Sequence, residues 1–500
     1  MILRDYQKKI LNDKIIVDIL RHIEGKKERP EITSPLVVSP TGSGKTAMFC
    51  AIAKFCQDRG LRVIILVHRE EILKQTLKSM FRLGITCGQI AAGKPITKDL
   101  IQVASVRSLI SKLGIIYKPN LIVTDEAHHT TEKNTWGKIH KFWSTVPNIG
   151  FTATPQRLDG VGLGLSYQKI IMGPSVRWLV DHGYLAFPIT YRPENEISAD
   201  YHITRGDFDT KEQQETMSKK QIVGDVINEY KKHLDGLPVI VACVSIDHAR
   251  LMAARFESEG YRSKVVWGGM TQTDREYAID GLGNGNVQVV TFCDLIGEGV
   301  DIPVLAGIIL LRRTASLALY LQWVGRALRM YEGKHRAIII DHANNYKIHK
   351  SVLIERQWSL DSQRRKKNDP EPVTTTCPKC YGIWPGKPIK CPDPDCGFLF
   401  KSERQIREEE IKVIAGNLVN AGFEGDEAEA AAGFIDAAMR ADPKIRQKML
   451  LQRTFALATE GDKGRDTIKE LARAVGYKNG WIDWAWKYAQ GELRKKETLG

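Results

Sequence analysis

Eight residues, Ser39–Thr46, have the types and spacing that bind phosphate groups. They read Ser-Pro-Thr-Gly-Ser-Gly-Lys-Thr and follow the apolar run Leu36-Val37-Val38. Glycines let backbone N–H groups turn inward around phosphate oxygens, and a helix that begins there adds its dipole. Lys45 would reach the β- and γ-phosphates, and the Thr46 hydroxyl would ligate Mg²⁺. The strict pattern has glycine where Ser39 stands, and the alternative is a glycine-rich turn without a ligand. The predicted residues of this loop are Thr41, Gly42, Ser43, Gly44, Lys45 and Thr46.

Two adjacent carboxylates could hold the metal and activate a water molecule. Asp125 and Glu126 directly follow the apolar run Leu121-Ile122-Val123 and precede Ala127-His128. Asp125 is suited to hold Mg²⁺ through water, and Glu126 to orient and deprotonate the hydrolytic water. Alone, an Asp-Glu pair at the end of a strand usually just starts a helix. Together with the glycine-rich loop, the pair predicts a nucleoside triphosphatase.

Four of the nine cysteines are clustered with the spacing of a metal site. Soft thiolates delivered by two short loops favour tetrahedral Zn²⁺, and about 20 residues need such a bond because they cannot build a core. An iron–sulfur cluster is the alternative. Nearby lysines would also permit contact with nucleic acid. The predicted zinc ligands are Cys377, Cys380, Cys391 and Cys396.

Buried parallel strands must position these groups. Short apolar runs alternate with helical patterns from residue 35 to about 151, which predicts a doubly wound α/β domain. A second series, from Pro238 to Ile340, repeats the scheme. The intervening residues 157–235 show no strong series of strands. Two similar α/β halves joined by a connector imply a cleft between them.

Composition and charge restrict the class of protein. The chain has 500 residues and an ordinary soluble balance of 43% hydrophobic and 26% charged residues, which excludes a wholly disordered or collagenous chain. Residues 401–500 carry 18 Lys and Arg against 17 Asp and Glu, so nearly all of the net charge of +14 falls on the first 400 residues. This basic balance favours a polyanionic partner, although a solvated basic surface would also explain it. The N-terminus lacks the layout of a signal peptide, and we expect a cytoplasmic, intracellular protein encoded by a bacterium or phage.

The chain resembles a superfamily 2 helicase of the DEAH-box kind, and residues 1–345 carry the ordered motifs. The loop Ser39–Thr46 is motif I in the form used by this superfamily, which accounts for the missing glycine. Further matches are Leu3–Gln7 (the adenine-reading Q element), Asp125–His128 (motif II), Thr152–Thr154 (motif III), Thr291–Pro303 (motif V) and Gln322–Arg329 (motif VI). The resemblance implies two tandem RecA-like domains, ATP and Mg²⁺ as cofactors, and nucleic acid as partner.

Motif VI also has a direct physical interpretation. Arg326 and Arg329 are three residues apart and would share one face of a helix. Guanidinium groups facing a γ-phosphate stabilise the charge that develops during phosphoryl transfer. Because they lie in the second half while Lys45 and Glu126 lie in the first, hydrolysis should require closure of the cleft. A surface salt-bridge face is the alternative.

The resemblance assigns further residues to three tasks. Additional nucleotide contacts are expected from Arg4, Gln7, Gly299, Asp301 and Gln322. Coupling of hydrolysis to strand movement is expected from His128, Thr152 and Thr154. Contacts to nucleic-acid phosphates are expected from His68, Arg69, Ser105, Arg107, Val244, Ser245 and Thr291, although each could be a plain polar residue at the end of a strand. Such contacts give affinity without sequence specificity.

One subgroup fits best, namely the RadD-type DNA-repair helicases, which include phage and prophage members. The similar segments are Phe151–Gly160 with Gly162-Leu163, and Gly476–Trp481, and the four-cysteine segment fits that layout. The expected function is ATP-driven translocation on, or unwinding of, DNA in repair, recombination or replication. The alternatives are an RNA helicase, an ATP-gated DNA-binding adaptor, and the motor of a restriction complex.

The sequence also predicts how the chain is divided. A four-cysteine zinc module and an α-helical region should follow the two RecA-like α/β domains. The helical region contains Trp481, Trp484 and Tyr488 at helical spacing, which favours core packing over docking of a partner or of bases. The predicted divisions are domain 1 (1–160), connector (161–235), domain 2 (236–350), linker (351–376), zinc module (377–400) and helical region (401–500).

Overall fold

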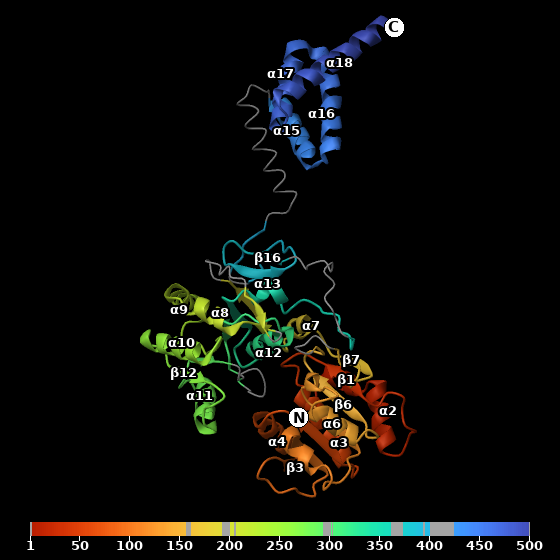
Figure 1. Cartoon of the computed structure of the whole chain (residues 1–500), viewed down its shortest axis with the longest axis vertical. Coiled ribbons are helices and arrows are strands. Elements are labelled where there is room, and N and C mark those ends of the chain that lie inside the picture. The colour runs from red at the N-terminus through yellow and green to blue at the C-terminus, as the bar shows by residue number, and fades with distance from the viewer. Residues whose placement is uncertain are drawn as a thin grey trace. The chain divides into compact units, whose positions relative to one another are not determined.

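The computed structural model describes most of the chain, and it divides into two units, Met1–Phe398 and Leu399–Gly500 (Figure 1). The described residues are 3–156, 162–192, 201–204, 207–293, 302, 304–361, 374–393, 396–400 and 425–499. The predicted nucleotide residues Gly299 and Asp301, and most of the motif V match, lie outside them. None of the helices among these residues is long and apolar enough to cross a membrane.

The first sheet has seven strands, all parallel, in the order β3-β4-β2-β5-β6-β1-β7. Its central strands are buried along their whole length because helices cover both faces. Its strands are β1 (Pro35–Val38), β2 (Val63–Val67), β3 (Cys87–Ile90), β4 (Ile101–Ser105), β5 (Leu121–Thr124), β6 (Asn148–Thr152) and β7 (Lys169–Met172). Its helices are α1 (Asp5–Leu11), α2 (Lys14–Ile23), α3 (Lys45–Gln57), α4 (Glu70–Arg82), α5 (Val106–Leu109), η1 (Ile110–Lys112), η2 (Ala127–His129) and α6 (Thr135–Phe142).

The second sheet has eight strands in the order β12-β13-β11-β14-β15-β8-β17-β16. It is parallel from β12 to β8, and β17 and β16 extend it in antiparallel fashion. Its strands are β8 (Phe187–Tyr191), β11 (Val239–Ala242), β12 (Ser263–Val266), β13 (Val289–Phe292), β14 (Gly307–Leu310), β15 (Arg336–Asp341), β16 (Thr374–Thr376) and β17 (Gly382–Pro385). The remaining elements of this region are α7 (Val176–Asp181), β9 (Ile203–Thr204), β10 (Asp207–Phe208), α8 (Thr210–Met217), α9 (Lys220–Leu234), α10 (Ile246–Ser258), α11 (Gln272–Asn284), α12 (Leu317–Ala327) and α13 (Asn345–His349).

These two sheets are the two parallel-sheet RecA-like domains that the sequence predicts. The connector differs from the expectation of no strong strand series, because β7 joins the first sheet and β8 joins the second. Both strands are short and only partly buried, so their apolar signal in the sequence is weak. The segment that carries the cysteines also extends the second sheet, through pairing of β17 with β8.

The C-terminal unit is a cluster of helices with its own core. Its helices are α15 (Gly425–Arg440), α16 (Pro443–Leu457), η3 (Ala458–Glu460), α17 (Gly461–Ala474) and α18 (Asn479–Leu499). Trp486 of α18 packs in this core, whereas Trp484 and Tyr488 are 50% and 45% exposed, with their rings stacked at 5.6 Å. The face expected to be buried therefore lies partly in solvent, because the core takes the neighbouring face of α18.

Candidate nucleotide-binding site

The loop Ser39–Thr46 joins the end of β1 to the start of α3, as phosphate chemistry requires. Gly42 and Gly44 have φ angles of 85° and 81°, in the left-handed region that favours glycine. Gly44 is the residue that precedes α3, so the backbone N–H groups at the start of this helix face the loop. The Lys45 ammonium donates to the Ser39 carbonyl oxygen at 3.3 Å, and the Ser39 hydroxyl donates to that of Ser43 at 2.7 Å.

The first helix supports this loop from outside. Tyr6 Oη and Gln7 Nε2 both donate to the Ser43 carbonyl oxygen, at 2.6 and 2.9 Å. The Gln7 Oε1 atom accepts from the Arg4 backbone N–H, and the whole Gln7 side chain is buried. A Cβ atom added to Gly44 would lie 2.5 Å from Gln7 Nε2. In this arrangement Gln7 therefore buttresses the phosphate loop.

The two carboxylates follow β5 at the carboxyl edge of the first sheet. Asp125 is 8% exposed and accepts from the Glu126 backbone N–H at 3.0 Å. Glu126 has a φ angle of 46°, a left-handed conformation that costs a non-glycine residue roughly 1–2 kcal/mol. Such strain persists only where the surrounding structure imposes it, and it is common at functional sites.

A contact with His128 and two hydrogen bonds beyond it link Glu126 to the end of β6. His128 Nδ1 lies 3.4 Å from Glu126 Oε2 and 3.0 Å from Thr152 Oγ1. The Thr152 hydroxyl donates to the Thr154 carbonyl oxygen at 2.8 Å, so in its bond with His128 it can only accept. His128 Nδ1 is therefore the donor. The three residues predicted to couple hydrolysis to movement thus form one connected network with Glu126.

The arginines of the second half face this same region. Arg326 lies in α12 and Arg329 two residues beyond its end, and both line a cavity of about 650 Å³. Burial lowers the pKa of the Arg329 guanidinium to about 10, which leaves it charged at neutral pH. The two halves meet closely at the loop, since a Cβ atom added to Gly325 would lie 2.6 Å from Thr41 Cβ. Gly325 is therefore required where α12 crosses the loop.

The cavity collects most of the residues predicted for nucleotide binding and hydrolysis, and its size suits a ligand as large as a nucleotide. Those that line it are Arg4, Thr41, Gly42, Gly44, Lys45, Thr46, Asp125, Glu126, Gln322, Arg326 and Arg329. Ser43, within the loop, and Gln7, behind it, do not line the cavity. They contribute through the backbone of the loop.

Sequence reasoning missed one wall of this cavity and one aromatic residue. Gln75, Ser79 and Arg82 line it from α4, and their helical spacing is a polar signal that could have identified this face. Tyr184 also lines it, and the Arg4 guanidinium lies over its ring at 4.6 Å. No local pattern around Tyr184 marks it.

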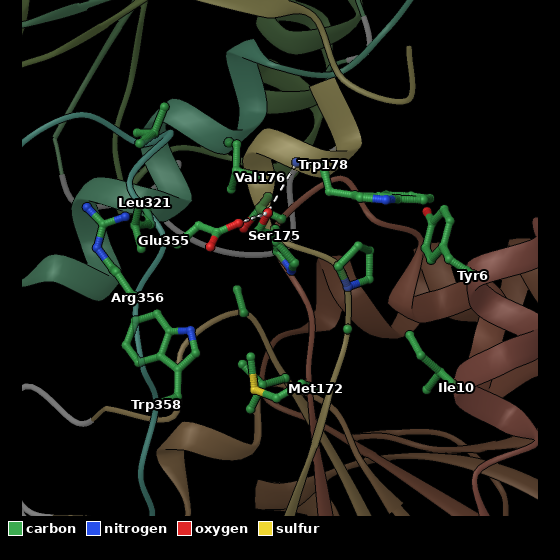
Figure 2. Close-up of a pocket in the computed structure, with 18 of the residues that line it drawn as sticks. Tyr6, Ile10, Met172, Ser175, Val176, Trp178, Leu321, Glu355, Arg356 and Trp358 are labelled. Carbon is green, nitrogen blue, oxygen red and sulfur yellow. Dashed lines mark hydrogen bonds between the residues drawn. The ribbon is translucent and has the colours of Figure 1, made fainter. Parts of the chain in front are cut away.

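A second cavity, of about 630 Å³, is also lined by part of the phosphate loop, through Pro40 and Thr41. Its lining includes Tyr6 and Trp178 on one side and Leu321 and Trp358 on the other (Figure 2). Among the residues predicted for nucleotide binding, Thr41 contributes to it. Many of its lining side chains are apolar or aromatic, whereas a phosphate site needs polar and positively charged groups.

The residues predicted to contact nucleic acid differ in how exposed they are. His68 and Arg69 follow β2 and are half-buried, Arg107 is exposed after β4, and Ser245 is half-buried at the start of α10. Each comes at the carboxyl end of a parallel strand, where the loops of such sheets meet. The three others are buried: Ser105 at 7%, Val244 at 2% and Thr291 at 0% exposure.

The Thr291 placement leaves little room for the predicted contact. Its hydroxyl donates to the Ala249 carbonyl oxygen at 2.8 Å inside the second domain. Its side chain thus has no exposed surface for a phosphate in this arrangement.

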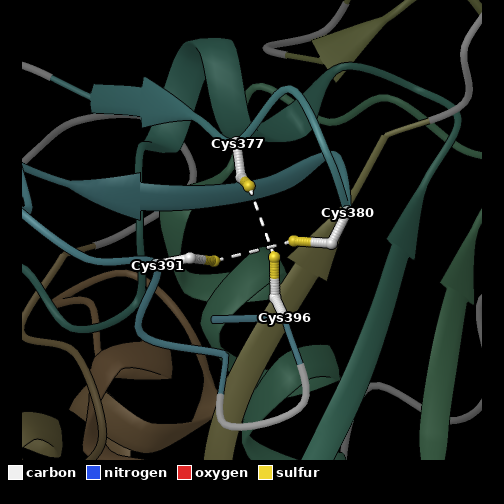
Figure 3. A group of neighbouring side chains, drawn as sticks. All are labelled: Cys377, Cys380, Cys391 and Cys396. Atoms are coloured by element: carbon white, nitrogen blue, oxygen red, sulfur yellow. Dashed lines mark hydrogen bonds between the residues drawn. The ribbon is translucent and has the colours of Figure 1, made fainter. Parts of the chain in front are cut away.

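The four cysteines converge on one point (Figure 3). All four Sγ atoms lie within 4.8 Å of one another, with Cys377–Cys396 at 3.6 Å and Cys380–Cys391 at 3.7 Å. Tetrahedral zinc with Zn–S bonds of about 2.3 Å requires sulfur atoms roughly 3.8 Å apart. The donor set and its spacing therefore fit Zn²⁺.

The cysteine cluster is tied to the second sheet by side chains as well as by strand pairing. Asp393, between two of the cysteines, is 4% exposed and accepts from the Tyr191 hydroxyl at 3.0 Å. Trp384 of β17 stacks on Phe187 of β8 with ring centroids 6.0 Å apart. The segment that carries the cysteines is therefore part of the second domain, at the edge of its sheet.

Comparison with known proteins identifies the same two halves. Residues 1–157 match the family described as type III restriction enzyme, res subunit, and residues 198–331 match the helicase conserved C-terminal domain. A 51.5 kDa protein of a Lactococcus phage (isolate 7-9) is 30% identical over 469 residues, which are 91% of this chain and 99% of that protein.

Two further similarities cover the helicase-like part. The Saccharomyces cerevisiae protein assigned as the ATP-dependent helicase IRC3 is 29% identical over 326 residues, 60% of this chain and 47% of its own. The chain thus spans about half the length of that relative. A fragment assigned as the HsdR subunit of a type I restriction enzyme from Vibrio vulnificus YJ016 has a TM-score of 0.52 at 19% identity, with 69% of this chain and 68% of that chain covered. This last likeness shows the fold alone.

Proposed function

The chain belongs to superfamily 2 of the helicases, and on that premise we propose that it is a DNA-stimulated, Mg²⁺-dependent ATPase that moves along or unwinds DNA. The observation that carries the proposal is the single cavity that collects Lys45, Asp125 and Glu126 from one domain and Arg326 and Arg329 from the other. This constellation has every part that phosphoryl transfer to water needs.

Each of these groups has a distinct task in the proposed hydrolysis. Lys45 and the backbone N–H groups of the loop bind the β- and γ-phosphates. Thr46 and Asp125 are the residues that would hold Mg²⁺, which would neutralise charge on the phosphates when bound. Glu126 orients the attacking water and accepts its proton. Arg326 and Arg329 stabilise the charge of the transition state, so turnover needs both domains.

We place the base of the nucleotide against Arg4 and Tyr184, which also line the cavity. The Arg4 guanidinium lies over the Tyr184 ring at 4.6 Å. An adenine ring could stack on the same surfaces, because guanidinium planes and aromatic rings both accept π-stacking. Gln7 then acts on the nucleotide through the loop, by its hydrogen bond to the Ser43 carbonyl oxygen. Gly299, Asp301 and Gln322 complete the proposed nucleotide contacts.

Coupling follows from the network around His128. A change at Glu126 during hydrolysis reaches Thr152 and Thr154 through the contact of Glu126 with His128 and two hydrogen bonds beyond it. Thr152 ends β6, and the backbone N–H of Ser39 donates to its carbonyl oxygen at 2.9 Å. Movement of this strand end is thereby linked to both the water-activating carboxylate and the phosphate loop.

The proposed path for the nucleic acid runs over the carboxyl ends of the strands in both domains. His68, Arg69, Arg107 and Ser245 are the predicted residues that keep exposed surface there. Contacts of this kind neutralise phosphates and should make binding fall with rising salt. Ser105, Val244 and Thr291 would support this surface from beneath.

We assign the cysteine cluster to one Zn²⁺ with a structural task, held by Cys377, Cys380, Cys391 and Cys396. Purified protein should contain one zinc per chain by elemental analysis, and Cys391→Ser should lower this content. Cobalt substitution should give the absorption of a tetrahedral tetrathiolate site, whereas a brown protein with iron would overturn the assignment. The exposed-lysine variant Lys390→Ala is the control and should keep its zinc.

The proposed divisions are those predicted from the sequence, with two refinements supported by strand pairing. The connector (161–235) supplies strands to both sheets, and the cysteine segment continues the second sheet. Within superfamily 2 we place the chain with the RadD-type DEAH-box helicases of DNA repair, since its Asp125-Glu126-Ala127-His128 sequence and its cysteine segment have their form.

ATP hydrolysis by wild type and Lys45→Ala, with different polymers, tests this function. We expect strong stimulation by single-stranded or forked DNA, weak stimulation by RNA, and loss of hydrolysis in the variant. Equal or greater stimulation by RNA would replace DNA by RNA as the substrate. Hydrolysis indifferent to every polymer would favour an ATP-gated adaptor.

A second candidate is the motor of a restriction complex. The match of residues 1–157 to a restriction-enzyme subunit favours it. This function requires a nuclease partner, because the sequence offers no nuclease constellation. Translocation on duplex DNA without strand separation would support it, and unwinding of a fork by the chain alone would oppose it.

A further inference from the structure

A buried lysine lies beside the helix that carries the arginines. Lys334 is in the turn between α12 and β15 and is 4% exposed. Its ammonium donates to three backbone carbonyl oxygens: those of Ala327 and Leu305 and, at 3.0 Å, that of Arg329. Among the residues that the structure describes, no carboxylate forms a salt bridge with it. The partners of this charge are therefore three backbone carbonyl groups and the Tyr331 ring, whose centroid lies 5.2 Å from the ammonium.

Two of the three carbonyl groups that accept from Lys334 lie at the end of α12, the helix that carries the arginines. Ala327 is the last residue of α12, and Arg329 follows it by two. The last carbonyl groups of a helix have no donors within the helix, and a nearby positive charge also interacts favourably with its dipole. Leu305 directly precedes the segment that enters β14. One ammonium thus fixes the end of α12 to the segment that leads into β14, an interior strand of the second sheet.

A lysine in this place is costly for the fold. Burial lowers the pKa of its ammonium to about 7, since a charge is disfavoured away from water. Buried charges need compensating polar partners, and apolar residues of similar volume often serve stability equally well. Stability alone therefore does not explain why a lysine stands at this position. A need to hold the end of α12 in a fixed position would explain it.

We propose that Lys334 is a positioning residue for ATP hydrolysis, which holds the last turn of α12 so that Arg326 and Arg329 point at the γ-phosphate. This inference rests on the arginine roles proposed above. Removal of the ammonium releases the carbonyls of Ala327 and Arg329, and the last turn can then fray. Misplacement of a catalytic group by about 1 Å can cost on the order of 100-fold in rate.

The first test is a split between kcat and nucleotide affinity. Lys334→Met, which keeps the length and apolar stem of the side chain, should lower kcat by roughly 10- to 100-fold. The Kd for a fluorescent ATP analogue should stay within about twofold, because the phosphate loop lies in the other domain. Lys264→Met, at an exposed lysine of the same domain, is the control and should match wild type. Unchanged kcat, or equal losses in kcat and affinity, would overturn the proposal.

The second test asks whether Lys334 acts through the arginines. In an Arg326→Ala/Arg329→Ala background, Lys334→Met should lower the residual rate by less than about twofold. Multiplicative losses would show an independent effect and reject the positioning role. If Lys334→Met does not fold, Lys334→Gln, which retains an N–H donor, carries both measurements, with a smaller loss in kcat and the same unchanged affinity.

The two proposals fail in different ways. Full kcat in Arg326→Ala and Arg329→Ala would remove the arginine roles, and with them the proposed mechanism. Impaired arginine variants beside a fully active, folded Lys334→Met would remove the positioning role alone.

Discussion

The two RecA-like domains hold their nucleotide-facing groups by different means. The first domain presents Lys45 and Glu126 on turns at strand ends, where Gly42, Gly44 and Glu126 itself adopt left-handed backbone conformations. The second domain presents Arg326 and Arg329 from the end of a regular helix, which reaches the cavity through packing against the loop. Local backbone geometry therefore positions Lys45 and Glu126 in the first domain. Packing between the domains positions Arg326 and Arg329 in the second.

The arginines provide the largest test of this contrast. We expect Arg329→Ala to lower kcat by about 10³-fold or more, as is usual for arginines that contact a transferring phosphoryl group. Nucleotide binding should persist, because the loop that binds the phosphates is unaltered. Arg255→Ala, at an exposed arginine that pairs with Glu259, is the matched control. Loss of binding together with kcat would show that both domains bind the ground state.

Glu126 tests the first domain. Glu126→Gln should reduce kcat by about 100-fold or more, since the amide cannot accept the proton of the attacking water. ATP should still bind, and the variant should stall with nucleotide and DNA bound. Steady-state hydrolysis and a nucleotide-trapping assay measure both effects. Exposed Glu132→Gln should behave as wild type, and a fully active Glu126→Gln would deny the water-activating role.

A substitution at Gly44 tests whether backbone conformation alone positions the nucleotide-facing groups of the first domain. Gly44→Ala places a side chain at φ 81° and 2.5 Å from Gln7 Nε2, so it should cost about 1–2 kcal/mol of strain plus the displaced hydrogen bond. Gly60 has φ 68° with open space around it, and Gly60→Ala should cost the conformational strain only. Urea unfolding gives both free energies, and KM for ATP should rise only for Gly44→Ala. Equal losses of stability and equal KM values in the two variants would show that the contact of Gly44 with Gln7 contributes nothing.

The smallest effect concerns how the domains meet beside the cavity. Glu71 of α4 pairs with Arg275 of α11, and Lys74 pairs with Glu276 at 3.6 Å, so two ion pairs link the domains. Glu71→Arg should change DNA-independent hydrolysis by about threefold, and adding Arg275→Glu should restore it. Failure of the double variant to recover would mean that each residue acts on its own domain.

The comparison also shows where sequence reasoning succeeded. The loop is one continuous segment and the two carboxylates are adjacent residues, each segment follows an apolar run, and both segments line the same cavity. The cysteines likewise converge, because their short spacings leave few other arrangements. Prediction was weaker for β7 and β8, whose partial burial gives little apolar signal, and for Tyr184, which no local pattern marks.

The sequence by itself determined which reactive groups this protein carries: a glycine-rich loop with a lysine, a pair of carboxylates, two arginines and four cysteines, each specified by residue type and local spacing. The tertiary structure decided which of them meet. It placed Gln7 behind the loop, buried Thr291 in the second domain, joined the cysteine segment to the second sheet and set Lys334 under the end of α12. These placements depend on contacts between residues far apart in the chain, and local propensity carries no information about such contacts.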